Sequence, residues 1–224
     1  AFAEWLGTLR TQKTIRGRLN VLSHFRPHFL APIFSLLQGL QDPIVNLSMG
    51  QTAENLAYQF DIARAAMDQY AVQSHQRVMK ARQSGYFEEI TPLFDSSGGF
   101  VAQDQGVRED SRVEKLATLR PVFDKPFGAV TAGNSSQISD GAAFLLLASV
   151  QAVKRYQLPV MGKIIDTAWA ALDPAVMGLG PVFAIQDLLS RQNLQIKDID
   201  YWEINEAFAA QVLACVKKLS SNDP

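Results

Sequence analysis

One stretch of the chain, residues 128–149, places the strongest local constraints on the fold. It reads GAVTAGNSSQISDGAAFLLLAS. The β-branched pair Val130 and Thr131 predicts a strand that enters a polar loop, in which Gly133 permits close backbone approach or a positive φ. The apolar run that follows, residues 142–147, predicts a buried helix that continues to about Tyr156. Such a loop is typical of an ordinary turn, but it can also bind a polar ligand, and the pattern alone leaves both interpretations open.

The composition is that of a globular protein with one large domain or two small ones. The chain has 224 residues, 47% hydrophobic and 19% charged, with a formal net charge of -1. No apolar run approaches the roughly 18–20 residues of a membrane-spanning helix. The single cysteine, Cys215, excludes an internal disulfide and suits a reducing compartment, so we predict a cytoplasmic location. The three histidines show no clustered metal-ligand spacing, and no metal site is predicted.

The first 48 residues combine an excess of positive charge with a helical pattern. Ile15, Leu19, Leu22 and Phe25 recur at helical spacing, and Pro27 should end this helix near Phe25 or Arg26. An apolar prolyl segment, HFLAPIFSLL, follows. The apolar stripe could pack on the body of the protein with the arginines solvated. Alternatively, it could contact an anionic membrane surface or a partner subunit, which would make the chain membrane-associated.

Two helices are predicted in the next segment. Thr52 is a good N-cap for a helix ending near Phe60, with Glu54 in its first turn. A longer helix should span residues 64–84 and end at Gly85, although Ala63 provides no capping oxygen. Its inner face consists of Met67, Tyr70, Ala71, Ser74, Val78 and Ala81, and we assign His75 on this helix a structural role.

The remaining segments predict a polar loop and then an α/β unit. Residues 95–110 read as a hairpin or crossover, and Ser111 should cap a helix reaching Leu119, with Glu114 completing a capping box. Strands over 161–170 and 198–204 should alternate with helices over 182–192 and 207–218, which favours a partly parallel sheet. Asn205 follows the second strand, where functional side chains gather in such folds.

Four motifs, in this order, resemble signatures of the thiolase family. They are MGQTAEN (49–55), LRPVFD (119–124), VTAGNSSQISDGAA (130–143) and NEAFAAQ (205–211). The resemblance runs from about residue 14 to the end of the chain. It implies an α/β fold class: a partial thiolase-like fold, with a mainly helical loop or lid domain over residues 1–136. An incomplete α/β unit, the truncated beginning of the C-terminal half, would follow over residues 137–224.

A second resemblance concerns residues 10–45. The text RLNVLSHFRPHFLAP is similar to an insertion in the thiolase subunit of β-oxidation multienzyme (trifunctional-type) complexes. That resemblance implies contact with a membrane or a partner subunit. The same multienzyme thiolases usually have His where this chain has Asn205, so the chain mixes the features of two subgroups.

The thiolase resemblance implies roles for eight residues. Asn205 would be catalytic, because the family's asparagine holds a water of the oxyanion hole for the thioester carbonyl. The implied substrate-binding positions are Ser136 (pantetheine amide), Ala132 (nearby backbone contact), Arg108 (CoA nucleotide), Phe123 (pantetheine arm), Met177 (CoA side), Met49 (acyl or pantetheine region) and Phe208. Coenzyme A is a substrate in this family, and no cofactor is implied.

The implied reaction is that of an acyl-CoA thiolase, in fatty-acid β-oxidation or acetoacetyl-CoA metabolism. It needs a nucleophilic cysteine and the histidine of a GHP motif, and neither occurs here, so this chain alone should be inactive. We expect it to be a fragment or a degenerate relative. The alternative function is a non-catalytic CoA- or acyl-binding or interaction module. The expected partners are acyl-CoA or CoA and, in the full-length form, a second copy of the protein, with no nucleic acid.

Overall fold

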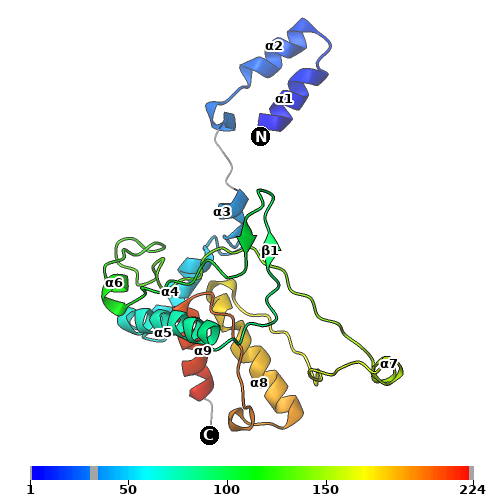
Figure 1. Cartoon of the computed structure of the whole chain (residues 1–224). Helices are drawn as coiled ribbons and strands as arrows, with labels where there is room; N and C mark the ends of the chain where they lie inside the picture. The colour runs from blue at the N-terminus through cyan, green and yellow to red at the C-terminus, as the bar shows by residue number, and fades with distance from the viewer. Residues whose placement is uncertain (1, 31–34, 222–224) are drawn as a thin grey trace. The chain divides into compact units, whose positions relative to one another are not determined.

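The computed structural model describes residues 2–30 and 35–221, and the chain divides into two compact units, Ala1–Gln41 and Asp42–Pro224 (Figure 1). The first unit contains α1 (Phe2–Thr11), α2 (Ile15–Ser23), the 3-10 helix η1 (Pro27–Leu30) and α3 (Ser35–Gly39). Trp5 joins α1 to α2, because its Nε1 donates to the Val21 carbonyl at 2.9 Å. The Trp5 ring also contacts the Phe25 ring edge-on, with 5.0 Å between the centroids.

The predicted helical stripe of the first unit is present on α2, but it is exposed. Ile15 is 80% exposed, Leu19 60% and Leu22 47%. The helix ends at Ser23, two or three residues before the end predicted near Phe25 or Arg26. Residues 31–34 of the predicted apolar prolyl segment lie outside the described residues. In the part of the chain that the structure describes, no helix is both long enough and apolar enough to cross a bilayer.

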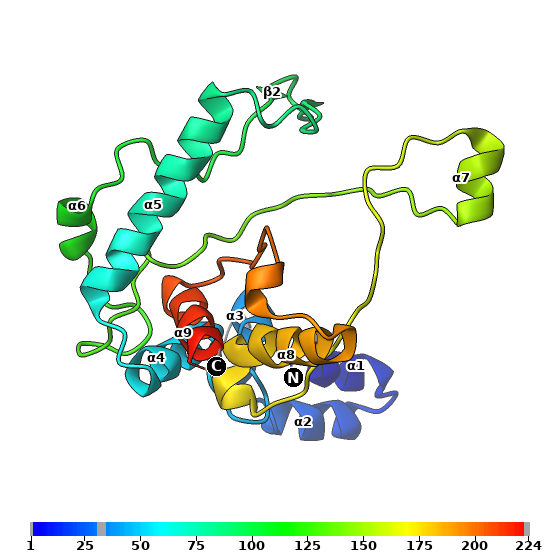
Figure 2. The ribbon, with the colours of Figure 1, turned by 90° about the horizontal axis from the view of Figure 1, so that it is seen from below.

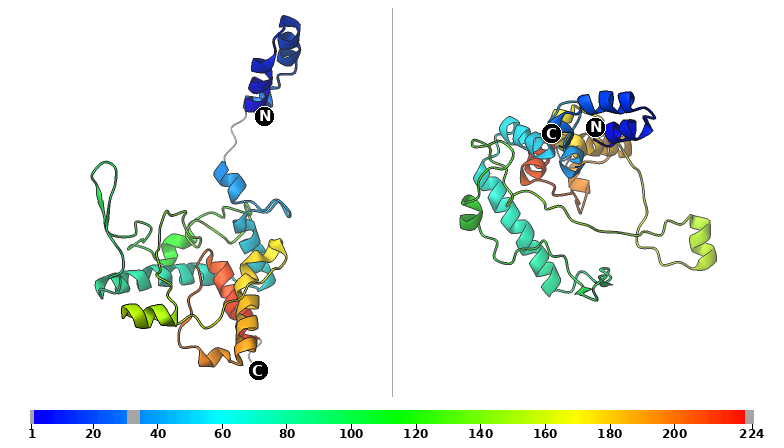
Figure 3. Two further views of the ribbon diagram at one scale, coloured as in Figure 1. Left: turned by 90° about the vertical axis from the view of Figure 1, so that its right-hand side faces the viewer. Right: turned by 90° about the horizontal axis from the view of Figure 1, so that it is seen from above.

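Packed helices form the core of the second unit. Helix α4 (Met49–Gln59) packs against η2 (Pro174–Leu179) and α9 (Ala209–Ser220), and Figures 2 and 3 show α4 and α9 side by side. Helix α9 also contacts α5 (Arg64–Gln83) and α8 (Gly180–Gln192). Two apolar clusters fill these contacts; their buried members are Ala53, Ala57, Met67, Val130, Ala209 and Ala210 in one, and Leu56, Leu179, Val182, Ala214, Cys215 and Leu219 in the other.

The smaller elements lie at the edges of this unit. Helix α6 (Val113–Ala117) packs on α5, and β1 (Leu93–Phe94) pairs antiparallel with β2 (Phe100–Val101). This hairpin confirms one of the two predictions for the polar loop. Helix α7 (Val150–Tyr156) lies at the end of two long connections without helix or strand (Figure 2), and η3 (Ile196–Asp198) follows α8.

The predicted N-caps at Thr52 and Ser111 were wrong. Helix α4 begins a turn earlier, at Ser48, whose Oγ accepts from Gln51 N at 3.3 Å while Gln51 Oε1 accepts from Ser48 N at 2.9 Å. Thr52 is consequently buried inside the helix, where its hydroxyl donates to the Met49 carbonyl. Arg112, not Ser111, stands at the N-cap of α6, so the Ser111 hydroxyl is one residue too early to reach the orphan N–H groups of the first turn.

Helix α5 matches its prediction closely. It runs from Arg64 to Gln83, Ala63 caps it without a side-chain hydrogen bond, and Gly85 follows with φ +74°. The predicted helices near α8 and α9 are also present, within two residues at each end.

The predicted strands of the α/β unit are not formed. Residues 130–131, 161–170 and 198–204 contain no strand, and the apolar run 142–147 is neither helical nor buried. Phe144 is 95% exposed and Leu147 72%, and the helix starts only after its cap at Ser149. The physical reason is that a strand needs a neighbouring strand for its backbone hydrogen bonds. Among the described residues the β1–β2 hairpin is the only sheet, and Ser135 and Phe208 form an isolated antiparallel bridge.

Candidate functional site

Four of the residues singled out in the sequence line one small cavity. Met49 from α4, Met177 from η2, Phe208 before α9 and Asn205 surround a volume of about 180 Å³. The Phe123 ring packs edge-on against Phe208, one of these lining residues, with 5.9 Å between the centroids. Most of the remaining lining is apolar, with Ala53, Leu56 and Pro181 among its members. The cavity therefore suits a small apolar group beside the amides of Asn205 and Gln211.

The position of the Phe123 ring explains why residue 50, in the MGQTAEN motif, is a glycine. The ring lies so close to Gly50 that a Cβ at this position would overlap it. Gly133 has a comparable role, because a Cβ there would meet Leu116 and Leu119 methyl groups at 2.6 Å. Of the two roles predicted for Gly133, the structure therefore confirms close approach.

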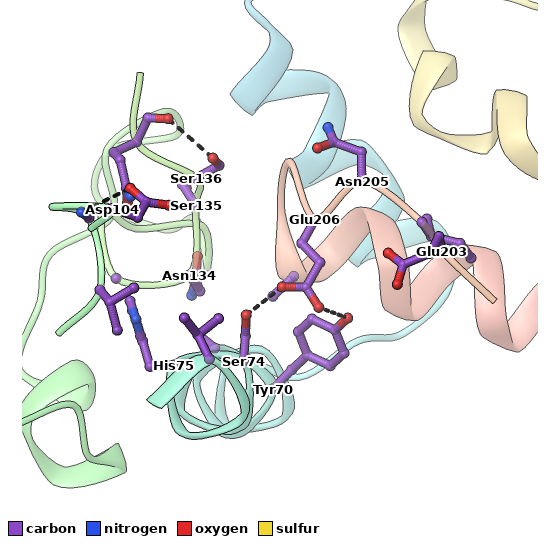
Figure 4. A pocket seen from close by; sticks show the side chains of 18 residues that line it. Tyr70, Ser74, His75, Asp104, Asn134, Ser135, Ser136, Glu203, Asn205 and Glu206 are labelled. Carbon is purple, nitrogen blue, oxygen red and sulfur yellow. Dashed lines mark hydrogen bonds between the residues drawn. The ribbon is translucent and has the colours of Figure 1, made fainter. Parts of the chain in front are cut away.

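A larger, polar hollow lies on the other side of Asn205. It measures about 800 Å³ and is lined by α5, by the loop that carries Ser136 and by residues 203–206 (Figure 4). Ser136 is exposed; its Oγ donates to the Gln137 carbonyl at 3.1 Å and its N–H to the Ala207 carbonyl at 2.9 Å. Ser136 and Asn205 thus line the same hollow, although they are 69 residues apart in the sequence.

Arg108 lies in an adjoining hollow of about 550 Å³ that shares Asp104, Gly106 and Gln137 with the first. The backbone N–H of Arg108 donates to His75 Nδ1 at 3.2 Å. Burial, and next the Arg108 charge, lower the pKa of His75, which favours the neutral imidazole that can accept this bond. His75 therefore ties the Arg108 loop to α5, in accord with the structural role predicted for it.

Comparison with protein families decides which class of protein has these features. The family model described as "Thiolase, N-terminal domain" matches residues 27–151, more than half of the chain, and the one described as "Thiolase, C-terminal domain" matches residues 158–223. The chain belongs to the thiolase family. Our predicted division between residues 136 and 137 stays a prediction.

Known thiolases resemble this chain over part of their length. The peroxisomal 3-ketoacyl-CoA thiolase of Saccharomyces cerevisiae is 44% identical over 174 residues, which are 77% of this chain and 42% of that protein. The crystal structure of human mitochondrial 3-ketoacyl-CoA thiolase in complex with CoA has a TM-score of 0.80 at 41% identity, covering 83% of this chain and 47% of that one. The structure of the dimeric peroxisomal thiolase of S. cerevisiae has a TM-score of 0.77 at 39% identity, covering 90% and 51%.

These likenesses show the thiolase fold, an α/β fold, and so confirm the predicted fold class. The chain spans about half the length of the relatives it matches. Seven of the eight residues implied by the thiolase resemblance lie in or beside the three neighbouring hollows. The eighth, Ala132, is exposed on the Ser136 loop, outside the residues that line them.

Two carboxylates hold the loop that carries Ser136 in place, and this role was not predicted from the sequence for either of them. Glu54 in α4 accepts backbone N–H bonds from Ala129 and Val130, each at 2.9 Å. Asp68 in α5 is 1% exposed; its Oδ1 accepts from Asn134 Nδ2 at 2.9 Å. The signal for Glu54 was its place in the MGQTAEN motif.

Asn134 is the centre of the loop. Its Oδ1 accepts from Thr131 N at 2.8 Å, and its backbone carbonyl accepts from Ala209 N, the first residue of α9, at 3.0 Å. The Asn134 side chain thus closes the loop that carries Ser136, and Asp68 holds this side chain through a hydrogen bond. The loop and the start of α9 are fixed to one another through Asn134.

Cys215 lies in the middle of α9 and is fully buried. Burial raises the pKa of its thiol, which donates to the Gly178 carbonyl at 3.2 Å. A thiol of this kind is protonated at neutral pH and is not an activated nucleophile. Cys215 is therefore a small buried member of the apolar cluster around α9.

Proposed function

We propose that this chain is the CoA- and acyl-binding portion of an acyl-CoA thiolase, an acetyl-CoA acyltransferase of fatty-acid β-oxidation or acetoacetyl-CoA metabolism. The observation that supports this most strongly is the meeting of the small apolar cavity and the polar hollow at Asn205. An acyl thioester has the same two-part character, since an apolar acyl chain is joined to a polar pantetheine arm through a carbonyl.

In this proposal each hollow takes one part of the ligand. The acyl end enters the cavity of Met49, Met177 and Phe208, with Phe123 packed against Phe208. Ser136 donates to or accepts from a pantetheine amide, near the backbone of Ala132. Arg108 pairs with a phosphate of the nucleotide, a contact for which a guanidinium is well suited.

The chemical step in this proposal is acyl transfer between CoA and a cysteine thiolate. The amide of Asn205 would donate to the oxygen on which negative charge develops, through a bound water, and such donors contribute strongly in thioester chemistry. The thiolate and its base would come from protein outside residues 1–224, because Cys215 is buried and protonated. The human relative at 41% identity was crystallised with CoA, which supports the assignment of the ligand.

Calorimetric titration with CoA tests this proposal. Arg108→Ala should weaken CoA binding by about tenfold or more, because it removes a charge-assisted hydrogen bond. Ser136→Ala should weaken it by about twofold to tenfold. Ser190→Ala, at an exposed position of α8 away from the hollows, is the matched control and should leave the affinity unchanged. No heat of binding with the wild-type chain at millimolar CoA would refute the proposal.

A non-catalytic interaction role is the second candidate, and one observation favours it. Ile15, Leu19 and Leu22 are exposed on α2, in the same helix as Arg16 and Arg18. A basic amphipathic helix of this kind can bind an anionic membrane surface or a β-oxidation partner subunit. Flotation with anionic liposomes at low salt tests the membrane form, and the absence of binding there would exclude it, because the attraction is strongest at low salt.

Self-association is a further part of the proposal. The S. cerevisiae peroxisomal thiolase structure is described as dimeric, and we propose that the full-length form of this protein is also a homo-oligomer. Light scattering of the full-length protein would test the oligomeric state, and a monomer at micromolar concentration would contradict the proposed homo-oligomer.

A cytoplasmic location is our proposal for this chain. The compartment differs among the relatives, which include peroxisomal and mitochondrial thiolases.

A further inference from the structure

Both oxygens of the Glu206 carboxylate are bound by hydroxyl groups of α5. Tyr70 Oη donates to Oε1 at 2.7 Å, and Ser74 Oγ donates to Oε2 (Figure 4). Tyr70 and Ser74 are four residues apart, so they lie one above the other on the same face of α5. The helix therefore presents a two-point holder for a single carboxylate from a segment 132 residues further along the chain.

This holder is not needed to stabilise a buried charge. Glu206 is exposed, so water could solvate its carboxylate without help from the protein. Two hydroxyls at fixed spacing instead restrict the direction of the side chain and of the backbone that carries it. The holder therefore acts on orientation, and the residue most affected is the one next to Glu206.

That residue is Asn205. Residues 201–206 contain neither helix nor strand. In Figure 4 the Glu206 side chain points toward α5, and the Asn205 amide points away from it. On the other flank, Ala207 accepts from Ser136 N at 2.9 Å, so the segment is also fixed to the substrate loop.

From this geometry we infer that Tyr70 and Ser74 are positioning residues, which hold Glu206 and thereby aim the Asn205 amide at the acyl carbonyl. The inference rests on the proposed function, since it assigns a thioester to the cavity. Burial, followed by the hydrogen bond to Glu206, raises the pKa of Tyr70 above its usual value near 10, so its hydroxyl remains a donor over the whole working range of pH.

The test compares two ligands that differ only in the acyl group. Acetyl-CoA has a thioester carbonyl that Asn205 can contact, and CoA has none. The ratio of the two dissociation constants therefore measures the contribution of the contact between Asn205 and this carbonyl. In the double variant Tyr70→Phe with Ser74→Ala, acetyl-CoA should bind about threefold to tenfold more weakly and CoA should bind unchanged. Tyr58→Phe, at a tyrosine that is 92% exposed on α4, is the control and should change neither constant.

A conservative pair of variants keeps the inference testable if the double variant does not fold. In Glu206→Gln the amide oxygen can accept from one hydroxyl and the amide NH2 can donate to the oxygen of the other, so the ratio should be preserved. Glu206→Ala removes both hydrogen bonds and should bring the ratio to that of the double variant. An unchanged ratio in the double variant or in Glu206→Ala overturns the inference, while the proposed function survives. If the wild-type chain binds neither ligand, the proposed function itself fails, so the two failures are distinguishable.

Discussion

Replacing Asp68 by Ala should destabilise the second unit more than any other single change of a charged residue that we consider. Asp68 is 1% exposed and accepts two hydrogen bonds, from Asn134 Nδ2 at 2.9 Å and from Arg64 Nε at 2.8 Å. Alanine removes both acceptors. It leaves the buried Nδ2 donor of Asn134 with only a longer hydrogen bond to the Ala129 carbonyl, at 3.2 Å.

The size of the loss in the free energy of unfolding depends on whether each donor that loses Asp68 is buried and whether it keeps another hydrogen-bond partner. Removing one partner of a fully buried ion pair costs about 3–5 kcal/mol. The Arg64 side chain is 24% exposed and keeps hydrogen bonds to the Leu116 and Leu119 carbonyls, so its share is at the low end. A loss of about 3 kcal/mol in the free energy of unfolding is therefore expected.

Urea denaturation followed by circular dichroism measures this loss. With a slope of about 2 kcal/mol per molar urea, the midpoint should fall by roughly 1.5 M. Asp187→Ala is the matched control, because Asp187 also pairs with an arginine four residues away but its side chain is 54% exposed. The control should change the free energy of unfolding by less than about 1 kcal/mol. A loss below about 1 kcal/mol for Asp68→Ala would refute the idea that this carboxylate holds the loop.

Three further predictions concern single residues. Ser48→Ala removes the cap of α4 and should lower the free energy of unfolding by about 1 kcal/mol in the same urea assay; no change would contradict the observed capping box. Because the pKa of His75 is lowered in the folded chain, the unfolded chain binds the proton more readily, and stability should fall as the pH drops below about 6.5. His75→Gln should show a smaller fall between pH 7.5 and 5.5, and an equal fall would count against this assignment. Cys215 should react with a thiol reagent only in urea, and rapid modification of the folded chain would show that its thiol is accessible.

Local patterns predicted the helices well because the causes of helix formation lie within a few residues. The span of α5 could be read from its apolar face and from Gly85, which ends it in the left-handed conformation. The start of α4 was missed by one turn because Ser48 and Thr52 are both good caps in isolation. The glutamine three residues after Ser48 decides between them, since it completes the reciprocal pair of hydrogen bonds.

The contacts that assemble the site could not be predicted from local patterns. Asp68 and Asn134 are 66 residues apart, and Glu54 and Val130 are 76 apart. Periodicity indicates which face of a helix is buried, but it gives no information on which distant loop meets that face. The candidate residues themselves came from the motifs, which identify positions without explaining what holds them. The carboxylates in α4 and α5, and the hydroxyls of Tyr70 and Ser74, provide that explanation.

The failure of the strand predictions has a different origin. The runs at 161–170 and 198–204 were predicted as strands from their apolar and β-branched residues, among them Ile164, Ile165 and Ile204. A strand of that kind is stable only inside a sheet, because its backbone groups and its side chains both need neighbours. In the described residues Ile165 and Trp169 are instead 68% and 87% exposed, and no ladder pairs these runs. A sequence pattern thus predicts which environment a segment requires. It does not predict whether the rest of the same chain supplies that environment. For the helices around Asn205 the chain supplies it, and this is why the candidate site is formed although the sheet beside it is not.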